Sequence, residues 1–204
     1  AVPDRPRPRV VATTHPNADL DALGSLAAVR RLHPGAVAVL SQGAEPVGRE
    51  LLERLGEAAP AVHELGEVEL SAVEELVVVD TADLGRLGEL GERARRGELA
   101  LTVYDHHGAR PDDLPAAATY RSAATGSNSA FLADLLREAG AALTPAEATL
   151  LASGVYEDTG MLTCAGVTAA DFEAARWLHE QGADLALVGR VLRQDLAPDQ
   201  LHLL

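Results

Sequence analysis

Short, continuously apolar runs alternate with amphipathic segments in the first half of this chain, and this alternation restricts the fold more than any other feature. Strands are predicted at 9–14, 36–40, 75–80 and 99–104, and helices at 22–32, 46–55 and 84–96. Strands that are apolar on both faces are typical of parallel sheets covered by helices. The pattern therefore predicts an α/β fold with a parallel, Rossmann-like sheet, in which ligands bind at the carboxyl ends of the strands.

The second half of the chain is predicted to be helical. The helices are expected at 126–139, 145–156, 169–181 and 185–193. Thr144, Pro145 and Glu147 form the pattern of a capping box with proline at the first helical position. Gly140 and Gly182 stand where helices should end. The expected fold is thus an α/β domain with a helical C-terminal portion.

Composition excludes several classes of protein. The chain has 204 residues, with 31 acidic against 17 basic side chains and a formal net charge of −14, which disfavours non-specific binding to nucleic-acid phosphates. Cys164 is the only cysteine, so a disulfide framework and a thiolate zinc site are excluded. No apolar run approaches the roughly 20 residues of a membrane span. Residues 1–9 are rich in proline and arginine without an apolar stretch, so we expect no signal peptide and a cytoplasmic location.

The segment after the first predicted strand carries the most chemistry. His15, Asp19 and Asp21 lie there, just before a predicted helix. Alternate residues of an extended loop share a side, so the two carboxylates can point the same way, within reach of the imidazole. Carboxylates this close raise each other's pKa unless a cation such as a divalent metal ion lies between them. One of the acids could instead cap the helix, which would leave the other acid and the histidine unexplained.

Further polar side chains follow other predicted elements. Asp80 ends a buried strand, where an exposed turn acid is the simpler interpretation, and Asp105, His106 and His107 directly follow the next strand. One histidine of that pair could be structural. Asp158 closes a predicted helix, where negative charge is unfavourable unless it is compensated.

Six of these side chains form a set of imidazoles and carboxylates without a thiolate: His15, Asp19, Asp21, Asp80, His106 and Asp158. Such ligands suit Mn²⁺, Mg²⁺ or Co²⁺. Because six ligands exceed what one ion needs, we expect two ions roughly 3.5–4 Å apart, bridged by a carboxylate and a water. That water becomes a hydroxide near neutral pH, and the pattern therefore predicts hydrolysis at phosphorus.

The same residues resemble the DHH phosphoesterase family, named for its Asp-His-His motif. Four blocks occur in the family's order over essentially the whole chain, namely His15…Asp19-x-Asp21, Asp80, Asp105-His106-His107 and Asp158. The family includes RecJ-like exonucleases, nanoRNA and 3′-phosphoadenosine phosphatases, cyclic dinucleotide phosphodiesterases and manganese-dependent inorganic pyrophosphatases. Within it, the chain is most similar to the amino-terminal DHH module of bacterial fusions with CBS domains and a poly(A)-polymerase or CCA-adding-like nucleotidyltransferase.

The resemblance implies a role for each residue, with Mn²⁺ as the expected ion and Mg²⁺ or Co²⁺ as alternatives. His15 and Asp19 would hold the first ion, Asp21, His106 and Asp158 the second, and Asp80 would bridge them. Asp105 would accept a hydrogen bond from a histidine and fix its tautomer, and His107 would face the substrate phosphate. Ser127 lies where amides open a predicted helix and could hold a phosphate, although a plain N-cap is the competing interpretation.

The resemblance also implies a domain boundary and partners. Residues 1–194 would form the DHH domain, and 195–204 would begin a linker to a substrate-binding DHHA1-type domain that the sequence does not contain. The chain would therefore be covalently joined to further domains and incomplete as an enzyme without them. Its expected partner is a nucleotide or short oligonucleotide substrate, with no membrane and no stable duplex nucleic-acid binding by this part alone.

The sequence thus predicts a metal-dependent phosphoesterase that hydrolyses a phosphomonoester or phosphodiester of a nucleotide or short oligonucleotide, as an exonuclease would. Two alternatives remain open. The module could be a regulatory or RNA-binding part of a tRNA nucleotidyltransferase-like protein, or it could be a manganese-dependent inorganic pyrophosphatase.

Overall fold

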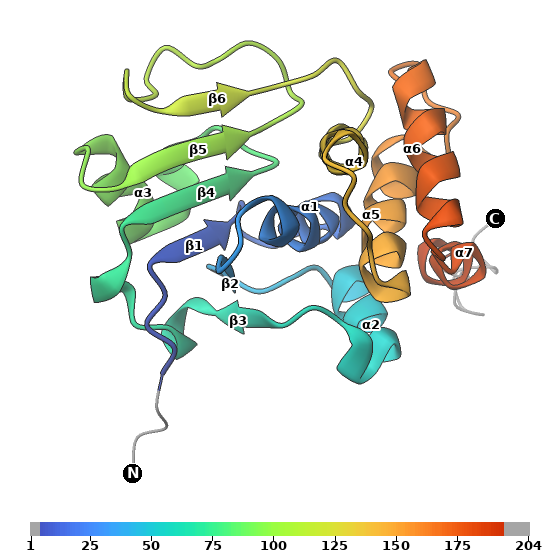
Figure 1. Cartoon of the computed structure of the whole chain (residues 1–204), viewed down its shortest axis with the longest axis horizontal. Helices are drawn as coiled ribbons and strands as arrows, with labels where there is room; N and C mark the ends of the chain where they lie inside the picture. Colours follow the sequence, from blue (N-terminus) through green and yellow to red (C-terminus); the bar gives the residue numbers. More distant parts are fainter. Residues whose placement is uncertain (1–4, 194–204) are drawn as a thin grey trace, which may run out of the picture.

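The computed structural model describes residues 5–193, which form a parallel sheet of six strands (Figure 1). The strands are β1 (Val10–Thr13), β2 (Val37–Leu40), β3 (Val62–Glu64), β4 (Glu75–Val79), β5 (Ala100–Tyr104) and β6 (Thr119–Arg121). Their order is β3-β2-β1-β4-β5-β6, so the chain moves outward from β1 in one direction and then crosses back to β4. In such sheets the ligand site lies where the direction reverses, here between β1 and β4.

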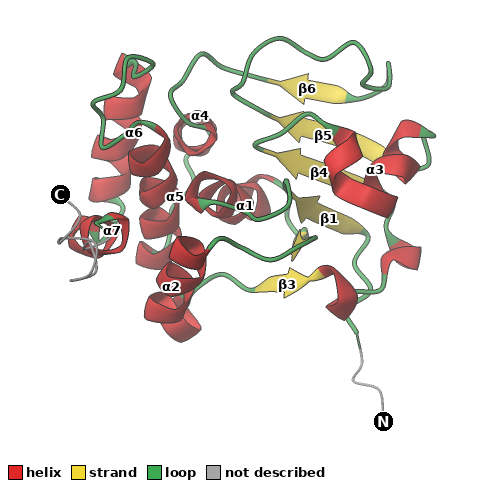
Figure 2. Ribbon diagram, turned by 180° about the vertical axis from the view of Figure 1, so that it is seen from behind, coloured by secondary structure: helices red, strands yellow, loops and turns green. Residues whose placement is uncertain are grey.

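Helices cover both faces of this sheet. They are α1 (Leu20–Leu32), α2 (Pro46–Leu55), α3 (Gly88–Arg95), α4 (Asn128–Glu138), α5 (Pro145–Asp158), α6 (Ala169–Glu180) and α7 (Leu185–Leu192). Figure 2 shows α3 in front of β4 and β5. Side chains of α3 share one core with Leu76 and Val78, whereas α1 and α4–α7 share the other with Val77 and Val79. Alternate residues of β4 therefore face the two layers, which is why that strand is apolar throughout.

The predicted fold class is confirmed, with differences in detail. The edge strands β3 and β6 were not predicted, because each is only three residues long and contains no buried residue. The helix predicted at 84–96 is instead a 3-10 turn at Leu84–Leu87 followed by α3, separated where Gly88 adopts φ 57°. Helix α1 begins two residues earlier than predicted, because Asp19 is its N-cap.

Several other local predictions agree with the structure. Thr144 and Glu147 form the predicted capping box of α5, and Gly140 and Gly182 follow α4 and α6 with positive φ. No helix in the described part of the chain is both long and apolar enough to cross a membrane. The predicted linker, 195–204, lies outside the described residues.

Helices α1 and α5 pack closely through two glycines. A Cβ added at Gly24 would lie 2.8 Å from the carbonyl oxygen of Leu150, and one at Gly154 would lie 2.7 Å from Cα of Asp21. Both distances are shorter than side chains tolerate, so only glycine permits this approach. The contact holds the first turn of α1, with Asp21, against α5, which ends at Asp158.

Gly154→Ala should lower the free energy of unfolding by about 1–3 kcal/mol, the usual cost of overpacking a core. The gain in helix propensity, about 1 kcal/mol, offsets only part of the strain. Urea denaturation measures the change, with Gly66→Ala as the matched control, because nothing lies within 4 Å of a Cβ at Gly66. Equal stability of the two variants would contradict the close-packing account.

Candidate metal centre

The predicted metal-ligand residues lie together at the carboxyl edge of the sheet, on both sides of the β1–β4 boundary. The loop after β1 carries His15 and Asp19, Asp80 follows β4 directly, and His106 lies just after β5. The last residue of α5, Asp158, completes the group. Segments from four separate parts of the sequence therefore form one cluster.

One half of the cluster is formed by His15, Asp19 and Asp80, whose potential ligand atoms all lie within 4.8 Å of one another. Nε2 of His15 lies 3.6 Å from Oδ2 of Asp19 and 3.3 Å from Oδ2 of Asp80. Nδ1 of the same ring lies 3.0 Å from the carbonyl oxygen of Pro16. A proton on Nδ1 would therefore leave the Nε2 lone pair directed at the two carboxylates.

The other half is formed by Asp21, His106 and Asp158, again with ligand atoms within 4.8 Å of one another. Nε2 of His106 lies 3.9 Å from Oδ2 of Asp21 and 3.4 Å from Oδ2 of Asp158. Nδ1 of His106 lies 3.2 Å from the carbonyl oxygen of Thr125, which orients this ring as Pro16 orients His15. The two histidines thus present equivalent nitrogens to the two halves.

Asp80 connects the halves. Its Oδ2 lies 3.3 Å from His15, and its Oδ1 lies 3.5 Å from Nε2 of His106. The side chain is only 4% exposed, which contradicts the simple interpretation of an exposed turn acid. Oδ1 of Asp80 and Nε2 of His106 are both buried without a hydrogen-bond partner in the described structure. Buried polar atoms rarely remain unpartnered, and a metal ion at this point would satisfy both, so the donor set is suited to divalent cations.

Helix termini hold the two aspartates of the first motif. Asp19 caps α1 by accepting a hydrogen bond from Ala22 N to Oδ1 at 2.8 Å, which leaves Oδ2 facing His15. Asp21 is fully buried and accepts hydrogen bonds from the amides of Asn128 and Ser129, each at 2.7 Å. The capping interpretation therefore applies to Asp19 without removing it from the cluster.

The backbone of this site is unusual. Among residues 5–193, the only non-glycine residues with positive φ are Asn17, Asp80, Met161 and Leu162, with φ between 53° and 62°. Asn17 lies between His15 and Asp19, and the pair Met161–Leu162 follows Asp158 closely. Left-handed conformations cost non-glycine residues of order 1–3 kcal/mol and gather at functional sites. The site loops thus contain all such positions of the described chain.

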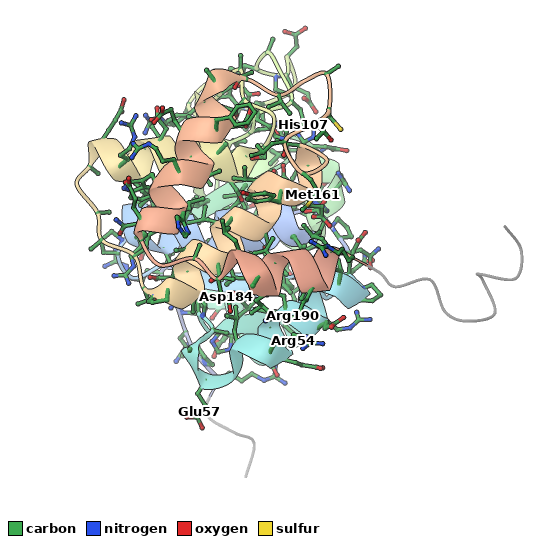
Figure 3. The ribbon with its side chains drawn as sticks, turned by 90° about the vertical axis from the view of Figure 1, so that its right-hand side faces the viewer. Arg54, Glu57, His107, Met161, Asp184 and Arg190 are labelled. Carbon is green, nitrogen blue, oxygen red and sulfur yellow. The ribbon has the colours of Figure 1, made fainter. Side chains whose placement is uncertain are left out.

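Asp105 and His107 form a pair beside the cluster. Nδ1 of His107 lies 2.6 Å from Oδ1 of Asp105, which is buried, whereas the His107 side chain is 61% exposed. The hydrogen bond to Asp105 raises the pKa of His107. Figure 3 shows His107 and Met161 on the same face of the molecule. His107 also forms a possible ligand group with Asp80 and His106, so its position permits contact with either a metal ion or a substrate.

The cluster is electrostatically strained without a cation. Burial raises the pKa of Asp21 well above its usual value, and the charges of Asp80 and Asp158 raise it further. Burial and the charge of Asp80 raise the pKa of Asp158 to about 6. Burial alone would lower the pKa of His106, but its contact with Asp80 and the charge of Asp21 prevail and raise it to about 9. Asp21 and Asp158 thus bind a proton more tightly than free carboxyl groups do, at positions where a metal ion could replace the proton.

This arrangement defines the class of protein as a parallel α/β domain with a buried His/Asp cluster suited to divalent metal. Residues 9–155 match the DHH family, N-terminal domain, and the chain therefore belongs to the DHH family. This confirms the resemblance seen in the motifs. Asp158 lies just beyond the matched residues, and its place in the cluster comes from the structure.

Two relatives match nearly the whole chain. An A-adding tRNA nucleotidyltransferase of Geobacter sulfurreducens is 40% identical over 196 residues, which cover 95% of this chain and 22% of that protein. One of Aquifex aeolicus is 30% identical over 195 residues, covering 96% of this chain and 22% of that protein. The chain therefore spans about a fifth of the length of these relatives.

Two solved structures share the fold. A putative family II inorganic pyrophosphatase of Methanococcus jannaschii superposes with a TM-score of 0.68 at 20% identity, covering 89% of this chain and 59% of that one. An exopolyphosphatase-related protein of Bacteroides fragilis gives 0.73 at 17% identity, covering 96% and 59%. At these identities the likeness establishes the fold alone.

Ser127 is the N-cap of α4, which was the interpretation competing with a phosphate contact at this residue. It is fully buried, and its hydroxyl accepts a hydrogen bond from Ala130 N at 3.0 Å as the N-cap of α4. The neighbouring amides of Asn128 and Ser129 donate to Asp21. The structure therefore favours the N-cap interpretation over a phosphate site at this helix end.

Two supporting residues were missed by the sequence reasoning. Asp171 accepts a hydrogen bond from Thr168 N in the capping box of α6 and another from the amide of Gly126 at 2.9 Å. It thereby fixes the loop whose Thr125 carbonyl orients His106. Glu157 accepts a hydrogen bond from Leu20 N at 2.8 Å and so holds the start of α1. Both contacts join residues far apart in sequence, and no local pattern indicates them.

The metal-free chain should lose stability relative to Asp158→Asn as the pH rises from about 4 to about 7. Folding raises the pKa of Asp158 from 3.8 to about 6, so the folded state binds this proton more tightly than the unfolded state. Its stabilising effect is complete below the unfolded pKa and is lost as the pH passes the folded one. Urea denaturation in a chelator at several pH values measures the difference, and Mn²⁺ should reduce it. Parallel pH profiles for the two proteins would contradict the electrostatic account.

Proposed function

We propose that the chain is a metal-dependent phosphoesterase domain that hydrolyses a phosphomonoester or phosphodiester of a nucleotide or short oligonucleotide. The observation that carries this proposal is the Asp80 carboxylate, which directs one oxygen toward each half of the cluster. In this proposal, His15 and Asp19 hold one ion and Asp21, His106 and Asp158 the other, with Asp80 shared. Mn²⁺ is the proposed ion, with Mg²⁺ or Co²⁺ as alternatives, because the donors are imidazoles and carboxylates.

The protein's own groups would orient the reaction. Two ions held by these residues would supply an activated water and would neutralise charge on phosphate oxygens. The Asp105 carboxylate holds Nδ1 of His107 and leaves Nε2 directed away from that bond. Because the same contact raises the pKa of His107, this ring can donate a proton or a hydrogen bond to a substrate phosphate. The carbonyl oxygens of Thr125 and Pro16 would accept the Nδ1 protons of His106 and His15, so that Nε2 of each ring is the nitrogen directed at the metal position.

A further domain would complete the enzyme. The chain spans 22% of the length of its tRNA nucleotidyltransferase relatives, and its net charge of −14 is poorly suited to hold a polyanion. We therefore propose that residues 1–194 form the catalytic domain and that a substrate-binding domain follows a linker beginning at 195–204. In this proposal, this part does not hold duplex nucleic acid alone, and exonucleolytic action would need the second domain.

Two alternative functions would use some of the same residues. Inorganic pyrophosphatase is favoured by the fold shared with the Methanococcus jannaschii protein. A regulatory or RNA-binding role within a tRNA nucleotidyltransferase is favoured by the two relatives of that name. Against the regulatory role, a module without catalysis has no need for a buried carboxylate between two ligand groups, given its cost.

The full-length protein should release product in a Mn²⁺-dependent manner from bis-p-nitrophenyl phosphate, 3′-phosphoadenosine 5′-phosphate or a short RNA. Asp80→Asn should reduce kcat at least about a hundredfold, because the variant weakens both halves of the cluster. Asp134→Asn, an exposed acid on α4, is the matched control. A turnover rate that does not depend on added metal, or that Asp80→Asn leaves unchanged, would refute the enzymatic proposal. Preferential release of phosphate from pyrophosphate would establish the pyrophosphatase alternative.

A further inference from the structure

A cavity of about 310 Å³ opens beside the metal centre. Asp80, Asp105 and His107 line it on the side of the cluster, and Thr81, Asp83 and Arg86 come from the loop and the turn that follow β4. Its volume is that of a small-ligand site. A group bound at the cluster would therefore extend into a space that also contains a guanidinium.

Arg86 differs from the arginines around it. Within the described part of the chain, no carboxylate lies within 4 Å of its guanidinium and it makes no hydrogen bond, although it is exposed to the cavity. By contrast, Arg95 pairs with Glu92 at 2.8 Å, and Arg93 donates to the carbonyls of Leu70 and Val73. Arg86 is thus available for a ligand, whereas its neighbours are engaged in the fold.

The carboxylates of the same cavity are already occupied. Asp80 faces His15 and His106, and Asp105 is bonded to His107. Asp83 accepts a hydrogen bond from Gly85 N at 2.8 Å and lies 3.8 Å from Arg95. The guanidinium of Arg86 is therefore the cation of this cavity that is free to bind an anion, and the exposed ring of His107 lines the same cavity.

We propose that Arg86 binds a second, uncleaved phosphate of the substrate, and that this contact selects substrates carrying two phosphates over those carrying one. The inference rests on the proposed phosphoesterase function, because it uses the same site. A guanidinium binds phosphate through two parallel hydrogen bonds, which gives both affinity and geometry. The chemical class is a nucleoside bisphosphate, a 5′-phosphorylated oligonucleotide or an inorganic polyphosphate.

A second group of arginines is less suited to this role. Arg54, Arg190 and Arg193 line a cavity between α2 and α7. Figure 3 shows Arg54 and Arg190 close together in this view, apart from His107. Arg54 lies 2.8 Å from Glu50 and Arg190 lies 4.0 Å from Asp184, so these cations already have acidic partners. None of these residues lines the cavity that contains Asp80.

The test compares Arg86→Ala and Arg86→Lys with wild type in the full-length protein at constant excess Mn²⁺. Arg137→Ala, an exposed arginine on α4 paired with Asp134, is the matched control. With 3′-phosphoadenosine 5′-phosphate, Arg86→Ala should raise KM about ten- to hundredfold and change kcat little, as expected for loss of a charged hydrogen bond. With bis-p-nitrophenyl phosphate, which has one phosphate, the change should stay within about threefold. Arg86→Lys should recover part of the loss.

Binding measured by calorimetry gives a readout independent of turnover. The probes are 3′-phosphoadenosine 5′-phosphate and pyrophosphate. Weaker binding of one or both by Arg86→Ala supports the proposal. The probe whose binding weakens shows whether the second phosphate belongs to a nucleotide or to an inorganic polyphosphate. Equal losses on the one-phosphate and two-phosphate substrates, or unchanged binding of both probes, would overturn it. Wild type that binds neither probe would also overturn it. Wild type that binds a probe through Arg86 but hydrolyses nothing would refute the proposed function alone.

Discussion

The structure depends on one constraint at the carboxyl edge of its sheet, the burial of like charges around Asp80. Asp80 directly follows β4, at the β1–β4 boundary where the strand order reverses, and it faces His15 and His106. Buried carboxylates repel one another and lose hydration, so they persist only with positive partners. The two imidazoles supply part of that charge, and the unpartnered atoms of Asp80 and His106 mark where more is required.

The remainder of the fold holds this cluster in place. The α1–α5 contact through Gly24 and Gly154 brings the start of one helix to the end of the other. The amides of Asn128 and Ser129 fix Asp21, and Asp171 fixes the loop that orients His106. Helix N-termini stabilise carboxylates through their free amides and their dipole. The packing of the helical layer therefore positions the side chains of the cluster at the sheet edge.

Much of this was predictable from the sequence, because continuous apolar strands and capping boxes are local signals. Residues such as His15, Asp80 and His106 each follow a strand, and a parallel sheet brings strand ends to one edge. Other features have no local signal. The edge strands β3 and β6 are too short and too exposed to show a pattern. The contact of Asp171 with Gly126 spans 45 positions. The availability of the Arg86 guanidinium depends on the absence of an acidic partner among the described residues, which only the three-dimensional structure reveals.

The central claim is that Asp80 joins two metal positions. Electron paramagnetic resonance of the protein titrated with Mn²⁺ tests it directly, because two ions sharing a carboxylate are magnetically coupled whereas isolated ions are not. The account predicts a spin-coupled signal that saturates at two ions per chain, and uncoupled signals in Asp80→Asn. A spectrum of isolated Mn²⁺ at every ratio in the wild-type protein, or a coupled spectrum that survives the substitution, would contradict it.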